Sequence, residues 1–101
     1  MVYEIKDEKG HDAFIANNDS VVIFFGSKNC GHCVRMSPII NQMESKYNNV
    51  KFAHVETTAL DVENISGVPV FVGYDRQVPI DVIVGADPDK ITRMIESKLL
   101  K

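Results

Sequence analysis

The stretch that decides the fold runs from residue 21 to residue 33 and reads Val21-Val22-Ile23-Phe24-Phe25-Gly26-Ser27-Lys28-Asn29-Cys30-Gly31-His32-Cys33. Its first five residues are β-branched or aromatic, as expected of a strand that is buried on both faces. Residues 26–29 break this strand. A helix is predicted from Cys30 onward, because apolar residues recur at helical spacing: Met36, Ile40, Met43 and Tyr47. Two cysteines therefore lie where a buried strand ends and a helix begins.

The remaining elements alternate along the chain. Strands are predicted over residues 2–5, where apolar residues alternate, and over 50–55, 70–72 and 80–84, with a hairpin turn at 75–77 and Gly85 ending the last strand. Helices are expected from Asp7 to about Asn18 and from Asp87 onward, and residues 57–65 have room for a short helix or an irregular crossover. Pro38 should kink the central helix. The order βαβαβ, then ββα, predicts an α/β fold with a mixed sheet covered on both faces.

Length and charge limit the possible functions. The chain has 101 residues, which fits a single domain spanning 1–101. A formal net charge of −3 gives no electrostatic reason to expect nucleic acid or an anionic membrane as a partner. The N-terminus lacks the basic start and apolar run of a signal peptide, and no stretch approaches the roughly 20 apolar residues of a membrane span. We therefore expect the protein in a reducing cytoplasm, and we also expect it to be a monomer.

The cysteine pair points to chemistry and not to a structural disulfide. A disulfide stabilises a fold mainly by closing a long loop of the unfolded chain, and the loop from Cys30 to Cys33 is almost as short as possible. At a helix N-terminus, unpaired amides favour the thiolate of Cys30, while Cys33 lies one turn further in. Cys30 should then attack a substrate disulfide, and Cys33 should resolve the mixed intermediate. Two alternatives remain open: half of a zinc site, although no second such pair exists, and incidental thiols in a binding module.

In this context, Cys30-Gly31-His32-Cys33 resembles the active site of thioredoxins and protein disulfide isomerases, with His32 as in the isomerase domains. The resemblance covers the chain: Pro38 lies five residues after Cys33, Val68-Pro69 stands where the family has its cis-proline, and Gly85 precedes the last helix. It implies a five-stranded thioredoxin fold and a thiol–disulfide oxidoreductase acting on protein disulfides. No bound cofactor and no metal is implied, and electrons would come from a separate reductase or from glutathione.

The resemblance also implies roles for the residues around the cysteines. Gly31, Val68 and Pro69 would bind substrate, and a cis bond at Val68 would free its backbone to pair with an extended substrate strand. His32 would stabilise the Cys30 thiolate and make the pair a better oxidant. We therefore expect a potential in the upper half of the range from about −270 mV, for thioredoxin, to about −180 mV, for the isomerase.

Several positions depart from the family pattern. Phe24 stands where the family keeps a buried acid that relays the proton of the resolving cysteine, and Phe52 is expected at the position of the lysine often found beside it. Glu56 or His54 could serve as the base through water, and turnover should be slower than in a typical thioredoxin. Gly26 and Asn29 replace aromatic residues, and tryptophan is absent. Lys28 and Arg35 flank the motif instead.

Two other functions fit parts of the sequence. A thioredoxin-fold binding module, or a subunit of a larger assembly, would carry the same pattern with thiols that do no chemistry. A glutaredoxin-like enzyme would act on glutathione mixed disulfides, but the Gly-Gly pair typical of that family is not found here. Insulin-disulfide reduction by the wild type and by Cys30→Ser separates the module from the enzyme.

Overall fold

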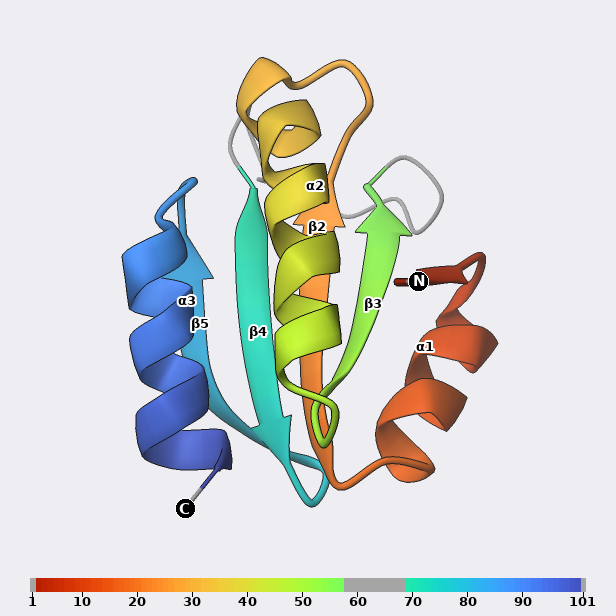
Figure 1. The fold of residues 1–101 in the computed structure, drawn as a ribbon. Coiled ribbons are helices and arrows are strands. Elements are labelled where there is room, and N and C mark those ends of the chain that lie inside the picture. The colour runs from red at the N-terminus through yellow and green to blue at the C-terminus, as the bar shows by residue number, and fades with distance from the viewer. Residues whose placement is uncertain (1, 58–68, 101) are drawn as a thin grey trace.

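A five-stranded sheet forms the centre of the computed structural model, which describes residues 2–57 and 69–100 (Figure 1). The strands are β1 (Tyr3–Ile5), β2 (Ser20–Gly26), β3 (Lys51–Glu56), β4 (Val70–Asp75) and β5 (Val78–Val84). Their spatial order is β1-β3-β2-β4-β5. β3 pairs in parallel with β1 and with β2, whereas β4 pairs antiparallel with β2 and with β5. The predicted mixed sheet is confirmed.

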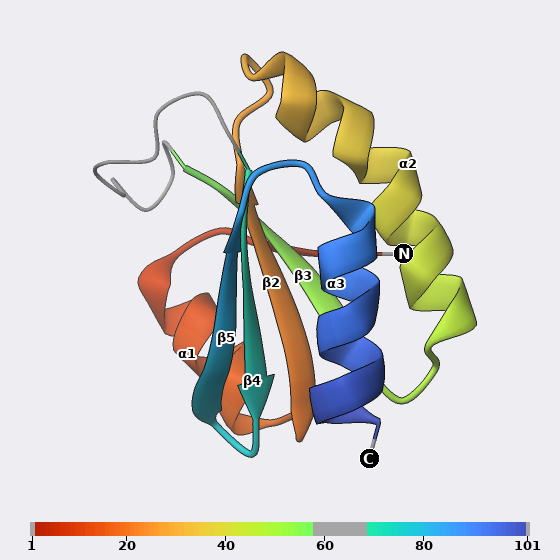
Figure 2. The ribbon, with the colours of Figure 1, turned by 90° about the vertical axis from the view of Figure 1, so that its left-hand side faces the viewer.

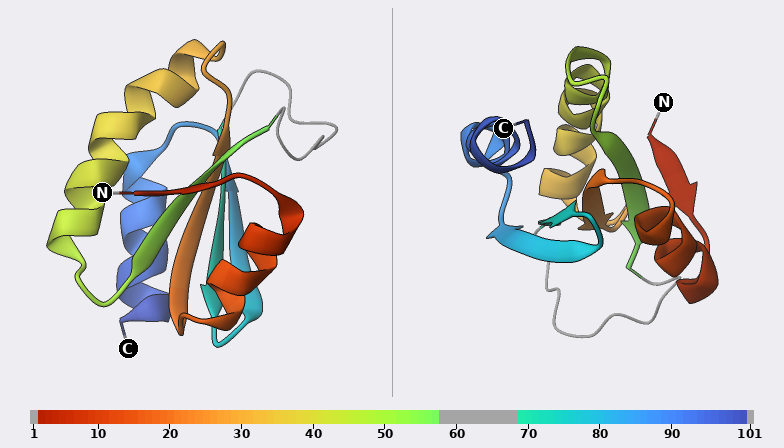
Figure 3. Two further views of the ribbon diagram at one scale, coloured as in Figure 1. Left: turned by 90° about the vertical axis from the view of Figure 1, so that its right-hand side faces the viewer. Right: turned by 90° about the horizontal axis from the view of Figure 1, so that it is seen from below.

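Helices cover both faces of this sheet. They are α1 (Glu8–Ala16), α2 (Gly31–Lys46) and α3 (Pro88–Met94), which continues as a π-helical turn, η1 (Ile95–Leu99). Figures 2 and 3 show α1 on one face and α2 with α3 on the other. Asp7 and Asp87 cap α1 and α3 by accepting hydrogen bonds from the backbone N–H groups of Gly10 at 2.7 Å and Lys90 at 3.2 Å. The α/β fold class inferred from the sequence is therefore observed.

The alternation of side chains along β2 gives each face its own core. Val22 and Phe24 point to the α2 face, where they join a large cluster. Val21 and Ile23 point to the α1 face and pack with residues of β1 and β3 in a smaller cluster. All four are at most 4% exposed, so the prediction of a strand buried on both faces is confirmed.

The apolar faces of the two long helical segments also agree with the sequence prediction. α2 buries Met36, Ile40 and Met43, and Tyr47 at its C-cap is 6% exposed. The last helical segment buries four residues: Ile91, Met94, Ile95 and Leu99. These residues pack against the sheet because they recur on one side of the helix.

Element boundaries differ slightly from those expected. β5 begins at Val78 and not at Ile80, because Arg76 and Gln77 both adopt positive φ, 51° and 74°, and close a tight two-residue turn. α1 ends at Ala16, where Asn17 is the C-cap. α2 runs through Pro38 without a break in its assignment, so a kink there stays a prediction. The crossover expected at 57–65 lies outside the described residues, apart from Thr57, which is in a turn.

Candidate active site

The two cysteines form a disulfide at the N-terminus of α2. Cys30 is the N-cap of the helix, and Cys33 lies in its first turn, with the two Cα atoms 5.2 Å apart. The C-terminal ends of β2 and β3 and the start of β4 meet at this same end of the sheet (Figure 1). The fold therefore presents the sulfur pair at one end of the molecule, on a helix that is anchored along its length in the core.

The backbone around Cys30 favours negative charge on its sulfur. The N–H of Cys33 donates a hydrogen bond to Sγ of Cys30 at 3.2 Å. This amide belongs to the first turn of α2, where N–H groups lack helical partners and carry the positive end of the helix dipole. Cys30 is 8% exposed and Cys33 4%, so the first cysteine is the more accessible of the two. This arrangement favours ionisation of the Cys30 thiol, with the Cys33 thiol more deeply buried next to it.

His32 lies on the exposed side of the same turn and contacts Arg35. Nη2 of Arg35 is within hydrogen-bond distance of Nδ1 of His32. Because a guanidinium only donates, Nδ1 must accept in this contact, which leaves the ring proton on Nε2. A Cβ at Gly31 would meet only the Arg35 side chain, at 3.9 Å, so Gly31 leaves open space beside the disulfide. His32 and Arg35 were both singled out from the sequence, but the contact between them was not predicted.

The loop before Cys30 is held in place by several hydrogen bonds. The N–H of Cys30 donates to the carbonyl of Ser27 at 3.0 Å, and the N–H of Lys28 donates to Oε1 of Glu56 at 3.0 Å. The N–H of Thr57 donates to the carbonyl of Gly26 at 3.2 Å. Glu56, considered from the sequence as a possible base, therefore also fixes the loop that leads into the active site.

Two departures from the family pattern, Phe24 and Gly26, fit one another. They are neighbours on one face of β2, and a Cβ at Gly26 would come within 2.7 Å of Cε1 of Phe24. The same atom would lie 3.0 Å from Cβ of Cys33. At such short distances, the Phe24 ring or the backbone would have to move to make room for the Cβ atom. The Phe24 ring thus fills the space that a side chain at position 26 would need, and it packs next to Cys33.

The prediction that Phe52 lies beside Phe24, at the position of the family's lysine, was wrong. In the observed register Phe24 is paired with His54 on β3, whereas Phe52 is paired with Val22, deeper in the sheet. The Phe24 and His54 rings lie 5.0 Å apart between centroids. The residue beside the missing acid is therefore a histidine. Phe52 and His54 point to the same face because they are two residues apart in a strand, so the side-chain alternation alone did not distinguish them.

His54 has a partner that could not be expected from the sequence. Nδ1 of His54 lies 2.9 Å and 3.0 Å from the two carboxylate oxygens of Glu4, on the neighbouring strand β1. A carboxylate only accepts, so Nδ1 donates to it. Glu4 is aligned with His54 in the parallel pairing of β1 with β3. The two residues are 50 positions apart in the chain, and only the strand order brings them together.

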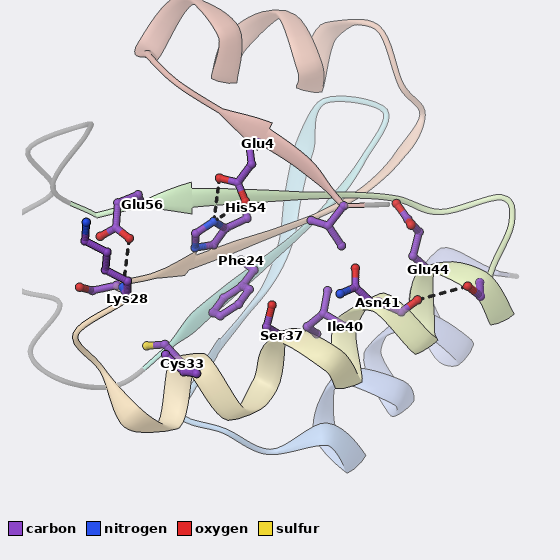
Figure 4. A pocket seen from close by; sticks show the side chains of 14 residues that line it. Glu4, Phe24, Lys28, Cys33, Ser37, Ile40, Asn41, Glu44, His54 and Glu56 are labelled. Carbon is purple, nitrogen blue, oxygen red and sulfur yellow. Dashed lines mark hydrogen bonds and ion pairs between the residues drawn. The ribbon is translucent and has the colours of Figure 1, made fainter.

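A cavity of about 570 Å³ opens beside Cys33, between α2 and the β1–β3 edge of the sheet (Figure 4). Its walls include Cys33, Phe24 and His54. Its charged residues are Glu4, Lys28, Glu44 and Glu56. The cavity therefore has Cys33 and the imidazole of His54 on the wall of one open space. Among the residues that the structure describes, no three His, Cys, Asp or Glu side chains are grouped to hold a metal ion.

The predicted substrate-binding residues are described only in part. Pro69 is fully buried and precedes β4, at the end of the sheet where the disulfide lies. Its carbonyl accepts a hydrogen bond from the N–H of Gly85 at 2.8 Å, and Gly85 has a φ of 109°, which favours glycine. Val68, and with it the cis bond expected before Pro69, lies outside the described residues. Over residues 2–57 and 69–100, no helix is long and apolar enough to cross a bilayer.

A five-stranded mixed sheet with a disulfide at the N-terminus of the central helix defines the class of thioredoxin-fold thiol–disulfide oxidoreductases. Comparison with known proteins agrees. The thioredoxin family profile matches residues 2–97. Thioredoxin H7 of Arabidopsis thaliana is 34% identical over 91 residues, which cover 84% of this chain and 69% of the plant protein.

A parasite relative matches over nearly its whole length. Thioredoxin 1 of Plasmodium falciparum is 26% identical over 95% of this chain and 96% of its own. The solved structure of Plasmodium falciparum thioredoxin superposes with a TM-score of 0.87 at 25% identity, covering 96% of this chain and 99% of that one. The chain belongs to the thioredoxin family, and it is a thiol–disulfide oxidoreductase whose redox-active disulfide joins Cys30 and Cys33.

Proposed function

We propose that this protein exchanges disulfides with other proteins through Cys30 as the attacking thiolate and Cys33 as the resolving thiol. In the reducing direction, Cys30 forms a mixed disulfide and Cys33 then displaces the substrate, so two electrons pass from the dithiol to the substrate disulfide. The observation that carries this assignment of roles is the hydrogen bond from the Cys33 amide to Sγ of Cys30. That amide stabilises the sulfur that must be ionised to attack.

The partners follow from the chemistry of a recycled dithiol. Extended segments of substrate proteins would bind around Gly31, Val68 and Pro69. A separate reductase or glutathione would restore the dithiol after each turnover. Such recycling needs a reducing compartment, and we place the protein in the cytoplasm for that reason. We expect it to act as a monomer, which light scattering of the reduced protein would test.

His32 makes the pair more oxidising in this proposal. With Arg35 on Nδ1, the Nε2–H of His32 is the group left to donate to the Cys30 thiolate. Stabilising the thiolate stabilises the reduced form and raises the potential. Equilibration with glutathione should give a potential above about −225 mV, and His32→Ala should lower it by about 30 mV, which is about 1.4 kcal/mol. A wild-type value at or below that of thioredoxin would contradict the role of His32.

Insulin reduction tests the function itself. With dithiothreitol as the electron source, the wild type should accelerate insulin precipitation, and Cys30→Ser should not. Cys33→Ser should accumulate as a mixed disulfide with insulin, visible as a mass adduct that thiols reverse. If the wild type and Cys30→Ser are equally inactive, the protein is a binding module and the proposal fails.

A further inference from the structure

The resolving step needs a proton acceptor near Cys33. A thiol attacks a disulfide as its thiolate, so Cys33 must lose a proton when it displaces the substrate from Cys30. Cys33 is only 4% exposed, which limits direct transfer to bulk water. The strand next to it offers a phenylalanine ring, Phe24, which takes no proton. The proton must therefore leave along another path, and among the residues that the structure describes the cavity beside Cys33 offers one.

His54 is built to receive a proton in that cavity. Its Nδ1–H donates to Glu4, which leaves Nε2, on the far edge of the ring, as the acceptor. Figure 4 shows the second ring nitrogen turned away from Glu4. The Phe24 ring packs against His54 and, together with the Glu4 contact, limits the orientations of the imidazole. Imidazole is the side chain that exchanges protons most readily near neutral pH.

The cavity provides the connection between the sulfur and the ring. Cys33 and His54 both line it, and a volume of about 570 Å³ has room for several waters, each of which takes about 30 Å³ in the liquid. Ser37 and Asn41 of α2 add hydroxyl and amide groups to its wall, so waters in it would find polar partners. A short chain of waters from Cys33 to Nε2 of His54 therefore fits the space.

Glu56 is the competing candidate, and its contacts favour a structural role. One of its oxygens accepts from the backbone of Lys28 and fixes the loop before Cys30. Protonating this carboxyl would weaken the hydrogen bond that holds the loop. Protonating His54 at Nε2 would not break its contact with Glu4, because that contact uses Nδ1.

We propose that His54, held in position by Glu4, accepts the proton of the Cys33 thiol through water during the resolving step. This inference rests on the proposed roles of Cys30 and Cys33. In the step, Cys33 sulfur bonds to Cys30 sulfur, and the bond from Cys30 to the substrate sulfur breaks. The substrate sulfur leaves with the electron pair as a thiolate, and the proton of Cys33 passes to Nε2 of His54. In the reverse direction, protonated His54 returns that proton to Cys33.

Rapid mixing of the reduced protein with the chromogenic disulfide dithiobis-nitrobenzoate separates the two steps. The first release of coloured thiol reports attack by Cys30, and the second reports resolution by Cys33. His54→Asn keeps a donor for Glu4 and removes the proton acceptor. We expect this variant to slow the second phase about tenfold and to leave the first phase unchanged. Many general bases contribute a rate factor of about a hundred or more, but here water can also accept the proton, so the expected loss is smaller. Glu4→Gln should slow the second phase by a smaller factor.

His11→Asn is the matched control. His11 is 20% exposed, against 21% for His54, and also contacts a carboxylate, Asp12, but it packs on Phe25 at the opposite face of the sheet. Both phases should be unchanged in this variant. Free imidazole should restore the second phase of His54→Ala, measured at a temperature where circular dichroism shows that the variant is folded.

The outcomes separate this inference from the proposed function. A wild type without a first phase would refute the proposed function. An unchanged second phase in His54→Asn, or equal slowing of both phases, would overturn the role of His54 and leave the exchange reaction standing. If Glu56→Gln alone slows the second phase, Glu56 is the acceptor and the inference is wrong.

Discussion

The two faces of the sheet differ in how their helices are held. On the α2 face, the cluster includes both cysteines together with large side chains such as Phe52, Phe71 and Met36. Both α2 and the segment formed by α3 and η1 bury four residues in it. On the α1 face, α1 buries no residue completely, and Phe14 and Ile15 pack only partly buried against strand residues. The disulfide is thus continuous with the better packed core.

This difference locates the functional sensitivity of the molecule. The packing of α2 in this cluster positions the sulfurs relative to the Phe24 ring and the cavity wall. Changes on the α2 face should therefore alter both stability and exchange chemistry, whereas changes on the α1 face should alter stability alone. Four tests, three of matched pairs of substitutions and one of a single substitution, follow in order of decreasing expected effect.

Matched isoleucines on the two helices should give the largest contrast. Ile40 of α2 is 1% exposed, whereas Ile15 of α1 is partly buried. Ile40→Ala should lower the free energy of unfolding by about 2–5 kcal/mol, because the cavity left in a packed core adds to the lost transfer energy. Ile15→Ala should cost about 1 kcal/mol. Urea unfolding measures both, and equal losses would show that the two faces are packed alike.

Gly26 and Gly31 compare a crowded position near the disulfide with an open one. Gly26→Ala would force its new methyl against Phe24 and Cys33, and should cost about 1–3 kcal/mol while changing the rate of the resolving step. Gly31→Ala meets only the end of Arg35 and should change stability by less than about 0.5 kcal/mol. Unfolding midpoints and the two-phase exchange assay check this pair. A tolerated alanine at position 26 would mean that the Phe24 ring moves freely.

The two aspartate caps compare a helix that is loosely packed with one that is well packed. Asp7→Ala and Asp87→Ala each remove a side-chain acceptor from a helix N-terminus, at a cost of about 1 kcal/mol. In α1 the loss should appear as faster amide hydrogen exchange confined to that helix, because few buried contacts couple it to the core. In α3 it should appear as a loss of global stability. The reverse pattern would contradict the comparison.

Tyr47 should show the smallest effect. Its hydroxyl donates to Oε2 of Glu96 at 2.6 Å, tying the end of α2 to η1. This hydrogen bond, followed by burial, raises the pKa of Tyr47 above its ordinary value of 10.0. Tyr47→Phe should cost about 0.5–1 kcal/mol at neutral pH.

Stability measured at alkaline pH tests whether the Tyr47 hydrogen bond stabilises the fold. A raised pKa in the folded state means that the stabilisation is fully present below pH 10.0 and is lost as the pH rises through the folded value. The stability difference between the wild type and Tyr47→Phe should therefore be constant at neutral pH and shrink above pH 10.0. Urea unfolding across that range measures it. A difference that grows with pH would refute the hydrogen bond as its cause.

Much of the fold was predictable because its signals are local. The apolar run of β2, the spacing of Met36, Ile40 and Met43 on α2, and the caps Asp7 and Asp87 each depend on residues close together in the chain. The cysteine motif and its position after a buried strand were likewise readable, since a helix begins where the strand breaks. These features were all confirmed.

The surroundings of Cys33 were not predictable in the same way. Phe52 was expected beside Phe24, but His54 lies there, and Glu4 approaches from β1. A shift of two residues keeps every side chain on the same face of a strand, so alternation cannot fix which residues are paired. The fit of Phe24 over Gly26 also depends on a ring position that no pattern encodes.

The sequence by itself determined the elements, their buried faces and the presence of a reactive cysteine pair, because each depends on periodicity or on chemistry within a few residues. Only the tertiary structure decided which groups share a cavity with Cys33. That choice depends on the strand order β1-β3-β2 and its register, which bring together side chains 50 residues apart. Such contacts result from the packing of the whole sheet, and no local stretch of the chain specifies them.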